Sequence, residues 1–354
     1  MVNGTDSQTQ TNFSGKTINL GATIDCGGAE LTPIGNTSEA NNSGAFRGTF
    51  NGNNYVIKNA TIASAENMGI LGLVYNGTIK NLTVESVTIS NAQTGSEPAA
   101  GIIAGSIRNS TVENITVSSS CSVNADMRAG GIVGSSRGAS SVLRMCVNHA
   151  PVTGTKYTGG IVGAAHELNY SSSGTEMTDC DNYGEVNGVN EVGGIVGYAD
   201  RAQLTDCDNH GTVTGTGNYG TGGILGFDAF NEGFLSFLDP TSGSTLNNCD
   251  NFADITGLRT GGIVGTFGSA PGDNQADDPI YCNIINCDNS GDIVGTAGKC
   301  GSIFGYQISY RYGDGESYIN NLQANIQSCG NTGLLNGEQV GTTQLSGSPF
   351  AVIS

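Results

Sequence analysis

Residues 177–197, MTDCDNYGEVNGVNEVGGIVG, contain two short motifs that recur along the chain. The second motif, the pentapeptide GGIVG at 193–197, occurs eight times in the same or a closely similar form. Its central residue is always isoleucine, and these isoleucines are Ile70, Ile102, Ile132, Ile161, Ile195, Ile224, Ile263 and Ile303. Their spacing of 29 to 40 residues is typical of solenoids, propellers and other repeat arrays.

The first motif reads apolar-x-x-Cys-x-Asn-x-(Gly/Ala)-x-apolar and occurs six times in succession. Its cysteines are Cys146, Cys180, Cys207, Cys249, Cys287 and Cys329. Its asparagines, two positions later, are Asn148, Asn182, Asn209, Asn251, Asn289 and Asn331. The apolar positions indicate short strands, and the asparagines and glycines, which tolerate left-handed backbone angles, indicate the corners between them.

These repeats predict an all-β chain. No window has the i, i+3, i+4, i+7 apolar spacing of an amphipathic helix, so helical repeats are disfavoured. We expect each repeat to form one turn of a single-stranded right-handed parallel β-helix, or β-solenoid, of about ten turns. Because stacked turns lie about 4.8 Å apart, equivalent residues should lie over one another as isoleucine, cysteine and asparagine ladders.

Both motifs resemble GLUG repeats, which occur in large bacterial surface proteins and in the non-catalytic region of bacterial immunoglobulin A peptidases. Residues 17–62, with TINLGATIDCGGAELTPIG and FRGTFNGNNYVIKNATI, resemble the module that often precedes those repeats. The resemblance covers nearly all of the chain and implies a β-helix and an adhesin-like protein. We accordingly expect an N-terminal tail or cap (1–16), leading turns (17–68), GLUG-type repeats (69–339) and a C-terminal turn or cap (340–354).

Composition narrows the classes of function. Lys and Arg number 13 against 31 Asp and Glu, so the formal charge is −18, and such a surface repels the phosphates of nucleic acids and anionic membranes. Residues 1–15 carry neither a basic start nor an apolar stretch, and no run approaches the roughly 18 apolar residues of a membrane helix. We expect a soluble, secreted or cell-surface protein with no nucleic-acid partner, no membrane-spanning segment, and a signal or anchor outside this sequence.

The ladder residues have a structural interpretation. Cβ atoms about 4.8 Å apart are too distant for a disulfide, which needs about 3.8 Å, so we interpret the ladder cysteines as small buried core residues. Zinc is the alternative, although CxxC and paired histidines are absent. Each ladder asparagine can bond the backbone or the next amide and so satisfy polar groups at a corner. The sequence does not pair the remaining cysteines, Cys26, Cys121, Cys282 and Cys300.

Aspartates follow four of the ladder cysteines, at Asp181, Asp208, Asp250 and Asp288. We expect them to form a row of carboxylates one turn apart. Such a row either raises its own pKa values or attracts a cation, which makes calcium the candidate metal and the one candidate cofactor. The alternative is that they are solvated acids that discourage pairing with other strands.

Three successive repeats contain long segments between the pentapeptide and the next strand, at 227–245, 266–283 and 306–325. Loops that leave neighbouring turns at one corner share a patch of surface. Their aromatic and charged side chains suit binding of a sugar or peptide. The candidate ligand-binding residues are Phe230, Asp273, Asp277, Asp278, Tyr306, Tyr310, Arg311, Tyr312, Asp314 and Glu316. The alternative is that the loop phenylalanines pack onto an apolar row, Val196, Leu225, Val264 and Phe304.

These features favour a non-enzymatic bacterial surface β-helix, adhesin-like or scaffold, that binds an extracellular glycan or a host or bacterial surface protein. The competing hypothesis is a carbohydrate-active β-helix enzyme, a polysaccharide lyase or glycoside hydrolase. Such enzymes combine clustered carboxylates with basic partners. Asp277 and Asp278 are adjacent, but Arg311 is the one basic residue in the three loops, so we assign no catalytic residue.

Overall fold

The computed structural model describes residues 12–35, 42–63, 66–91, 98–138, 140–166, 174–230, 242–269, 280–308 and 322–340. Within these ranges the chain forms β-strands and one short 3-10 helix, η1 (Asn42–Gly44), with no α-helix. The all-β prediction is therefore confirmed for this part of the chain. No helix in the same ranges is long and apolar enough to cross a membrane.

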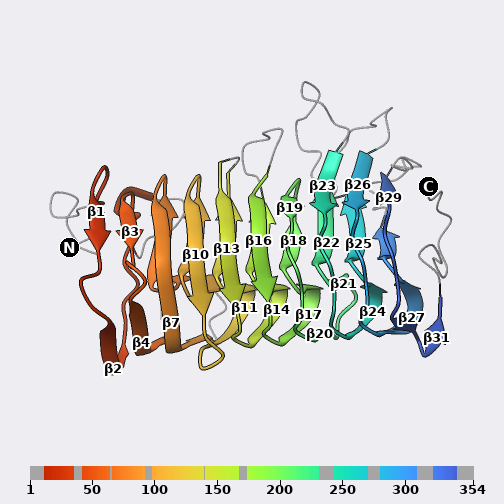
Figure 1. Cartoon of the computed structure of the whole chain (residues 1–354), viewed down its shortest axis with the longest axis horizontal. Helices are drawn as coiled ribbons and strands as arrows, with labels where there is room; N and C mark the ends of the chain where they lie inside the picture. Colours follow the sequence, from red (N-terminus) through yellow and green to blue (C-terminus); the bar gives the residue numbers. More distant parts are fainter. Residues whose placement is uncertain are drawn as a thin grey trace, which may run out of the picture.

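The smaller of two sheets contains the strands that begin within the last two residues of each pentapeptide. Each strand pairs in parallel with the equivalent strand of the next repeat, so the sheet runs along the molecule from β6 to β28 (Figure 1). Its strands are β6 (Leu71–Tyr75), β9 (Ala104–Arg108), β12 (Val133–Arg137), β15 (Val162–His166), β18 (Val196–Ala199), β22 (Leu225–Phe230), β25 (Val264–Ser269) and β28 (Phe304–Ile308).

The larger sheet contains the strands on both sides of the asparagine corner. The strands before the corner, with their equivalents in the leading repeats, are β1 (Thr17–Asn19), β3 (Thr49–Asn51), β7 (Thr78–Asn91), β10 (Thr111–Val117), β13 (Val142–Asn148), β16 (Glu176–Asn182), β19 (Gln203–Thr205), β23 (Ser242–Asn247), β26 (Ile280–Ile285) and β29 (Leu322–Gln327). β7 continues past the corner and also pairs with strands that lie after it, β4 and β11. The strands after it are β2 (Ile24–Glu30), β4 (Val56–Ile62), β5 (Asn67–Met68), β8 (Ala99–Gly101), β11 (Ser122–Gly130), β14 (Val152–Gly159), β17 (Val186–Gly193), β20 (Val213–Gly215), β21 (Thr221–Gly222), β24 (Ile255–Gly261), β27 (Ile293–Gly301), β30 (Leu334–Leu335) and β31 (Glu338–Gln339). Among the described strands, antiparallel pairing occurs between β30 and β31.

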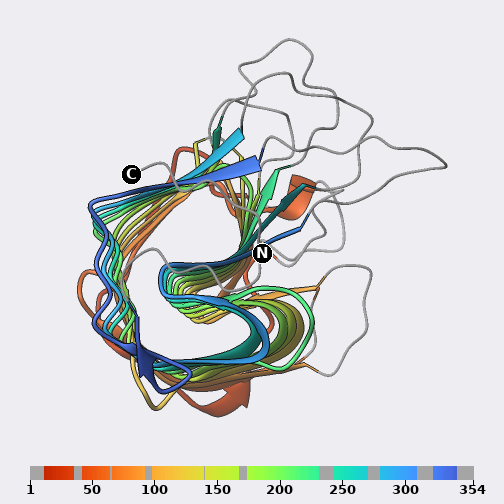
Figure 2. The same cartoon turned by 90° about the vertical axis from the view of Figure 1, so that its right-hand side faces the viewer.

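Equivalent residues of successive repeats lie over one another, as Figure 2 shows along the long axis of the molecule. Cys146 pairs in register with Cys180, and Val133 pairs with Val162. The isoleucines of the pentapeptide lie at the bend between strands, where the backbone N–H of Ile195 donates to the carbonyl oxygen of Ile224 at 3.0 Å. All eight are buried, and full burial of one isoleucine contributes about 1.5–3 kcal/mol. The isoleucine column therefore forms a continuous part of the core.

Close approach between turns explains the glycines of the pentapeptide. A Cβ atom on Gly194 would lie 2.0 Å from the carbonyl oxygen of Gly223 and 2.3 Å from Cγ of Asn209. A Cβ atom on Gly197 would lie 2.5 Å from the backbone nitrogen of Thr158 in the preceding turn. Any larger side chain would displace backbone at these points, so the packing of neighbouring turns requires glycine.

A left-handed residue bends the strand before each asparagine corner. These residues have φ between 51° and 55°, and they are Asn81, Asn114, Met145, Asp179, Asp206, Asn248, Asn286 and Ser328. Asparagine and aspartate adopt this conformation more readily than other residues with a side chain. The bend therefore accounts for the asparagine or aspartate found at most of these positions.

Candidate functional site

The three long segments leave the stack at neighbouring positions. In the smaller sheet β25 pairs with both β22 and β28, and in the larger sheet β26 pairs with both β23 and β29. Phe230 at the end of β22 pairs in register with Ser269. The ring centre of Tyr306 lies 5.0 Å from the guanidinium carbon of Arg259. The other candidates in these segments lie outside the described residues, namely Asp273, Asp277, Asp278, Tyr310, Arg311, Tyr312, Asp314 and Glu316.

The apolar row considered as a support for the loops belongs to the hydrophobic core. Its members are Val196, Leu225, Val264 and Phe304, all of which are buried. The side chain of Phe227 stacks on the ring of Tyr198 in the preceding turn, with centroids 5.9 Å apart and an interplanar angle of 4°. Phe227 therefore packs against Tyr198 of the neighbouring strand.

The ladder asparagines form one continuous chain of amide hydrogen bonds. From Asn148 to Asn331, each Nδ2 donates to Oδ1 of the next asparagine at 2.7 to 2.9 Å. Each Nδ2 also donates to the carbonyl oxygen two residues further on, at 2.7 to 2.9 Å. The hydrogen-bonding groups of these amides therefore find their partners within the protein. This arrangement is the one expected of a structural ladder at a corner rather than of a ligand site.

The ladder cysteines are free thiols, as are the other four cysteines. Five are buried and Cys329 is half-buried. The backbone N–H of Cys249 donates to Sγ of Cys287 at 3.3 Å. Burial raises the pKa of Cys180 and Cys207 well above its usual value, so these thiols stay protonated and are poor nucleophiles.

The carboxylates of the predicted calcium row bond the backbone of the next turn. Oδ1 of Asp208 accepts the N–H of Asp250 at 2.9 Å, and Oδ1 of Asp250 accepts the N–H of Asp288 at 2.8 Å. Burial raises the pKa of Asp181, Asp208 and Asp250, and the like charge of a neighbouring acid raises it further. Within the described ranges, no group of three or more His, Cys, Asp or Glu side chains is placed to hold a metal ion. These aspartates link one turn to the next, and calcium binding stays a prediction.

A column of stacked rings lies beside the asparagine ladder. The residue after the ladder asparagine is aromatic in four successive turns, and we call these residues, His149, Tyr183, His210 and Phe252, the ring column. Neighbouring ring centroids lie 4.9, 4.5 and 4.7 Å apart, with interplanar angles of 22°, 6° and 3°. Tyr183 is 46% exposed and Phe252 is 48% exposed. The rings cover one another's faces, so the column presents their edges to solvent.

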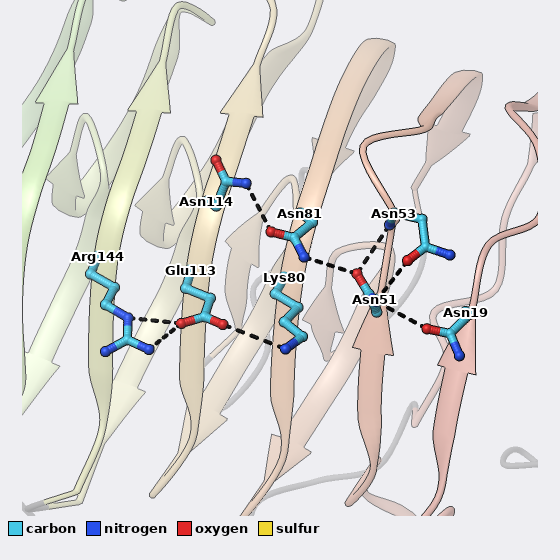
Figure 3. Close-up of polar contacts among 8 residues, drawn as sticks. All are labelled: Asn19, Asn51, Asn53, Lys80, Asn81, Glu113, Asn114 and Arg144. Carbon is cyan, nitrogen blue, oxygen red and sulfur yellow. Dashed lines mark hydrogen bonds and ion pairs between the residues drawn. The ribbon is translucent and has the colours of Figure 1, made fainter.

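The leading turns carry an exposed polar network, which Figure 3 shows. The amide of Asn114 donates to Asn81 at 2.8 Å, Asn81 donates to Asn51 at 3.0 Å, and Asn51 donates to Asn19 at 3.0 Å. Beside it, Glu113 accepts from Nε of Arg144 at 2.8 Å and pairs with Nζ of Lys80 at 3.8 Å. Exposed ion pairs of this kind contribute about 0–1 kcal/mol, so the network joins turns without marking a ligand site.

A group of titratable side chains gathers where the smaller sheet faces the ends of β14 and β17, and we call it the tyrosine cluster. It contains Lys156, Tyr157, Glu191 and Tyr198. The rings of Tyr157 and Tyr198 are 4.7 Å apart, and Nζ of Lys156 lies 4.5 Å from the ring centre of Tyr157. Burial raises the pKa of Glu191 to about 7, and the charge of Lys156 opposes that shift. A buried acid that titrates near neutral pH beside a lysine is typical of acid–base sites.

Basic side chains border the tyrosine cluster. Arg108, Arg137 and His166 occupy equivalent positions on three adjacent strands of the smaller sheet. The ring of His166 lies 6.4 Å from that of Tyr198. Burial, together with the charges of Arg137 and Arg128, holds the pKa of His166 well below its usual range. The neutral imidazole of His166 can accept or donate a proton, but no described neighbour bonds its Nδ1 atom.

Neither the ring column nor the tyrosine cluster was identified from sequence. The ring column has a sequence signal, because alignment of the six Cys-x-Asn blocks places His149, Tyr183, His210 and Phe252 at one position. The tyrosine cluster has no comparable signal. Its members come from two different strands per turn, and only the bend of the chain brings Glu191 near Tyr198.

Comparison with known proteins gives limited matches. No family model matches the chain. A segment of 112 residues is 36% identical to Halomucin of Haloquadratum walsbyi (strain DSM 16790 / HBSQ001), covering 30% of this chain, and the chain spans about 1% of that protein. A solved structure, a "putative immunoglobulin A1 protease" from Bacteroides ovatus, aligns over 97% of this chain and 78% of its own, with 16% identity and a TM-score of 0.41. The resemblance to GLUG repeats therefore stays a prediction.

Proposed function

We propose that the chain is a non-enzymatic, adhesin-like or scaffold module of a bacterial cell surface that binds a glycan or a surface protein. In this proposal the stacked strands form one right-handed single-stranded β-helix of about ten turns, with GLUG-type repeats over most of its length. The observation that carries the proposal is the in-register repetition of exposed side chains, of which the ring column is the clearest case.

Repetition of this kind supports a binding function on physical grounds. A partner that lies along the stack meets an equivalent side chain at every turn, so several weak contacts act together. The backbone of each turn is hydrogen-bonded to both neighbours, as at Ile195 with Ile161 and Ile224. Little conformational entropy is therefore lost when a ligand orders such a surface.

The state of the thiols is compatible with the secreted or cell-surface location that we propose. Free thiols in an oxidising environment normally pair or are oxidised. Eight of the ten cysteines here are buried, and burial raises the pKa of Cys282 as it does that of Cys180 and Cys207. Protonated, inaccessible thiols resist oxidation, so these cysteines are compatible with an extracellular chain.

A screen against a glycan array and against isolated cell-surface proteins tests the binding function. Two double variants test the two candidate surfaces separately. Tyr310→Ala with Tyr312→Ala removes aromatic groups of the long segments. Tyr183→Ser with Phe252→Ser removes two rings of the ring column. We expect one of these variants to lose binding that the unchanged chain shows. Absence of binding to every glycan and protein would contradict the proposal, and unchanged binding by both variants would place the site elsewhere.

The tyrosine cluster favours a second candidate function, that of a carbohydrate-active enzyme. Glu191, with its pKa raised to about 7, has the titration range of a general acid or base. Incubation with acidic polysaccharides, followed by detection of new reducing ends or unsaturated products, tests this candidate. Turnover that disappears in Glu191→Gln, or on changing Asp277, Asp278 or Asp314 to asparagine, would replace the binding-only proposal.

Calcium binding along the aspartate row is a further part of the proposal. Each carboxylate in the middle of the row uses Oδ1 for a backbone N–H, so a cation would have to be held by the second oxygens of successive turns. Calorimetric titration with calcium tests this, and Asp208→Asn should abolish any heat that the unchanged chain produces.

A further inference from the structure

Two rings of the column lie between acids at the asparagine corner: Tyr183 between Asp181 and Glu185, and Phe252 between Asp250 and Asp254. His210 has one such acid, Asp208, and His149 has none. Burial alternates along this stretch: the residues on either side of each ring, such as Asn182 and Gly184 beside Tyr183, are buried. The positions two before and two after Tyr183 and Phe252 are, like these rings, accessible to solvent. The first row is Asp181, Asp208, Asp250 and Asp288, and the second contains Glu185, Asp254 and Asp292. We call the ring column with these two rows the acidic ridge.

Acids greatly outnumber basic groups in the acidic ridge. The four corner segments 179–187, 206–214, 248–256 and 286–294 contain nine acids and no lysine or arginine. The acids of the second row are exposed. The first row is held in place by the backbone: Oδ1 of Asp208 accepts from the next turn, and so does Oδ1 of Asp250. A ligand of the ridge thus meets carboxylates on both sides of Tyr183 and of Phe252.

The geometry of the rings discriminates between classes of ligand. A sugar stacks on the face of an aromatic ring, but neighbouring rings only 4.5 to 4.9 Å apart cover most of these faces. Acidic glycans are repelled by the carboxylates. Lysine and arginine side chains fit better, because their apolar stems can lie on ring edges while their charged ends reach the carboxylates.

We infer that the acidic ridge binds an extended lysine- or arginine-rich segment of a partner protein. This inference rests on the proposed binding function and selects a protein rather than a glycan as the partner at this face. The apolar stems contact Tyr183 and Phe252, and the cationic ends pair with carboxylates of the two rows. Specific binding therefore requires the rings as well as the charge.

Calorimetric titration of the full chain with a short synthetic peptide of alternating lysine and serine tests the inference. We expect binding that weakens as salt is raised, because exposed charges are screened. The double variant Tyr183→Ser with Phe252→Ser should weaken binding by about tenfold or more, as loss of central aromatic anchors commonly does. Serine occurs naturally at the equivalent position of the next turn, Ser290, so the fold tolerates it.

The double variant separates specific binding from attraction to a negatively charged protein, because its net charge is unchanged. Tyr55→Ser is the matched control, since Tyr55 is 37% exposed on the leading turns and away from the ridge, and its affinity should equal that of the unchanged chain. Peptide binding that is absent at low salt, or equal in the ring variant, would overturn the inference. So would tighter binding of an acidic oligosaccharide that the ring variant loses.

Failure here is distinguishable from failure of the proposed function. A chain that binds a glycan or a surface protein in the screen but not the peptide retains the proposed function without this partner class. A chain that binds neither loses both. Circular dichroism of each variant establishes that the strands are intact, and Asp254→Asn, which removes one exposed acid of the second row, should weaken peptide binding less than the ring variant does.

Discussion

Two asparagine ladders in this molecule make similar hydrogen bonds in different surroundings. The exposed ladder of the leading turns joins Asn19, Asn51, Asn81 and Asn114 through bonds of 2.8 to 3.0 Å. The buried ladder from Asn148 to Asn331 has bonds of 2.7 to 2.9 Å. Water can replace a lost partner in the first ladder but not in the second. Although the bonds are of similar length, we expect loss of an asparagine from the buried ladder to lower the free energy of unfolding far more than loss of one from the exposed ladder.

The largest effect is expected where the pentapeptide glycine touches the buried ladder. Gly194→Ala would place a Cβ atom 2.0 Å from the carbonyl oxygen of Gly223 and 2.3 Å from Cγ of Asn209. We expect a loss of about 4 kcal/mol or more in the free energy of unfolding, at the exceptional end of single substitutions. Urea unfolding followed by circular dichroism measures it.

The matched control for this substitution is Gly21→Ala. Nothing lies within 4 Å of a Cβ atom built on Gly21, which is in the leading turns. Its stability should stay within about 0.5 kcal/mol of the unchanged chain. Similar midpoints for Gly194→Ala and Gly21→Ala would show that neighbouring turns do not approach as closely as described.

The next largest effect comes from the asparagines themselves. Asn209→Ala removes the acceptor of Asn182 and the donor to Asn251, and it leaves the carbonyl oxygen of Gly211 without its side-chain donor. Buried groups without partners cost about 1–3 kcal/mol each, so we expect a loss of about 3 kcal/mol. Asn51→Ala also removes bonds to two ladder neighbours, but water replaces them and the loss should be below about 1 kcal/mol. Equal losses in urea unfolding would contradict the comparison.

One exposed and one buried carboxylate extend this comparison to the pH dependence of the free energy of unfolding. Asp25 is exposed, and the amide of Asn59, 2.8 Å away, lowers its pKa. Asp228 is fully buried, and burial raises its pKa to about 7 although Ser244 donates both its N–H, at 3.0 Å, and its hydroxyl, at 2.6 Å. Because the folded pKa of Asp228 exceeds its unfolded value, its contribution to stability is fully present below about pH 4. That contribution is lost as pH rises through about 7.

Asp228→Asn isolates this effect, since the amide keeps an acceptor for Ser244 but does not ionise. Relative to the variant, the unchanged chain should lose about 3–4 kcal/mol between pH 4 and pH 8. Urea midpoints of both proteins across this range measure the difference. A difference that does not vary with pH would mean that Asp228 titrates as an ordinary exposed acid does.

The parts of the structure that repeat are those that the sequence predicts. The spacing of the isoleucines and of the Cys-x-Asn blocks predicts parallel strands with like residues in register, because each turn must repeat the packing of the one before. Asn209 and Gly194 are conspicuous in sequence for the same reason. Their positions were therefore predictable without knowledge of how the chain bends between them.

Features that depend on the local bend were not predictable in the same way. The sequence did not show that Asp208 and Asp250, aspartates of the predicted cation row, each use Oδ1 to accept a backbone N–H of the next turn. The ring column is hard to recognise in the sequence because the residue at its position varies between His, Tyr and Phe. Glu191 and Tyr198 lie on strands separated by a bend, and pairing of such residues depends on the angle of that bend rather than on residue type.

The smallest expected effect is a gain in stability at the C-terminal end of the exposed ladder. Met145 occupies the position equivalent to Asn114, with φ of 51° against 52°, and its side chain is 48% exposed. A residue other than glycine, asparagine or aspartate is disfavoured in this conformation by about 1 kcal/mol. Met145→Asn should raise the free energy of unfolding by about 0.5–1 kcal/mol, and its amide could donate to Asn114 as Asn114 does to Asn81. Met145→Ala keeps the backbone strain and should give no gain, so equal urea midpoints for the two variants would show that the left-handed bend does not select asparagine here.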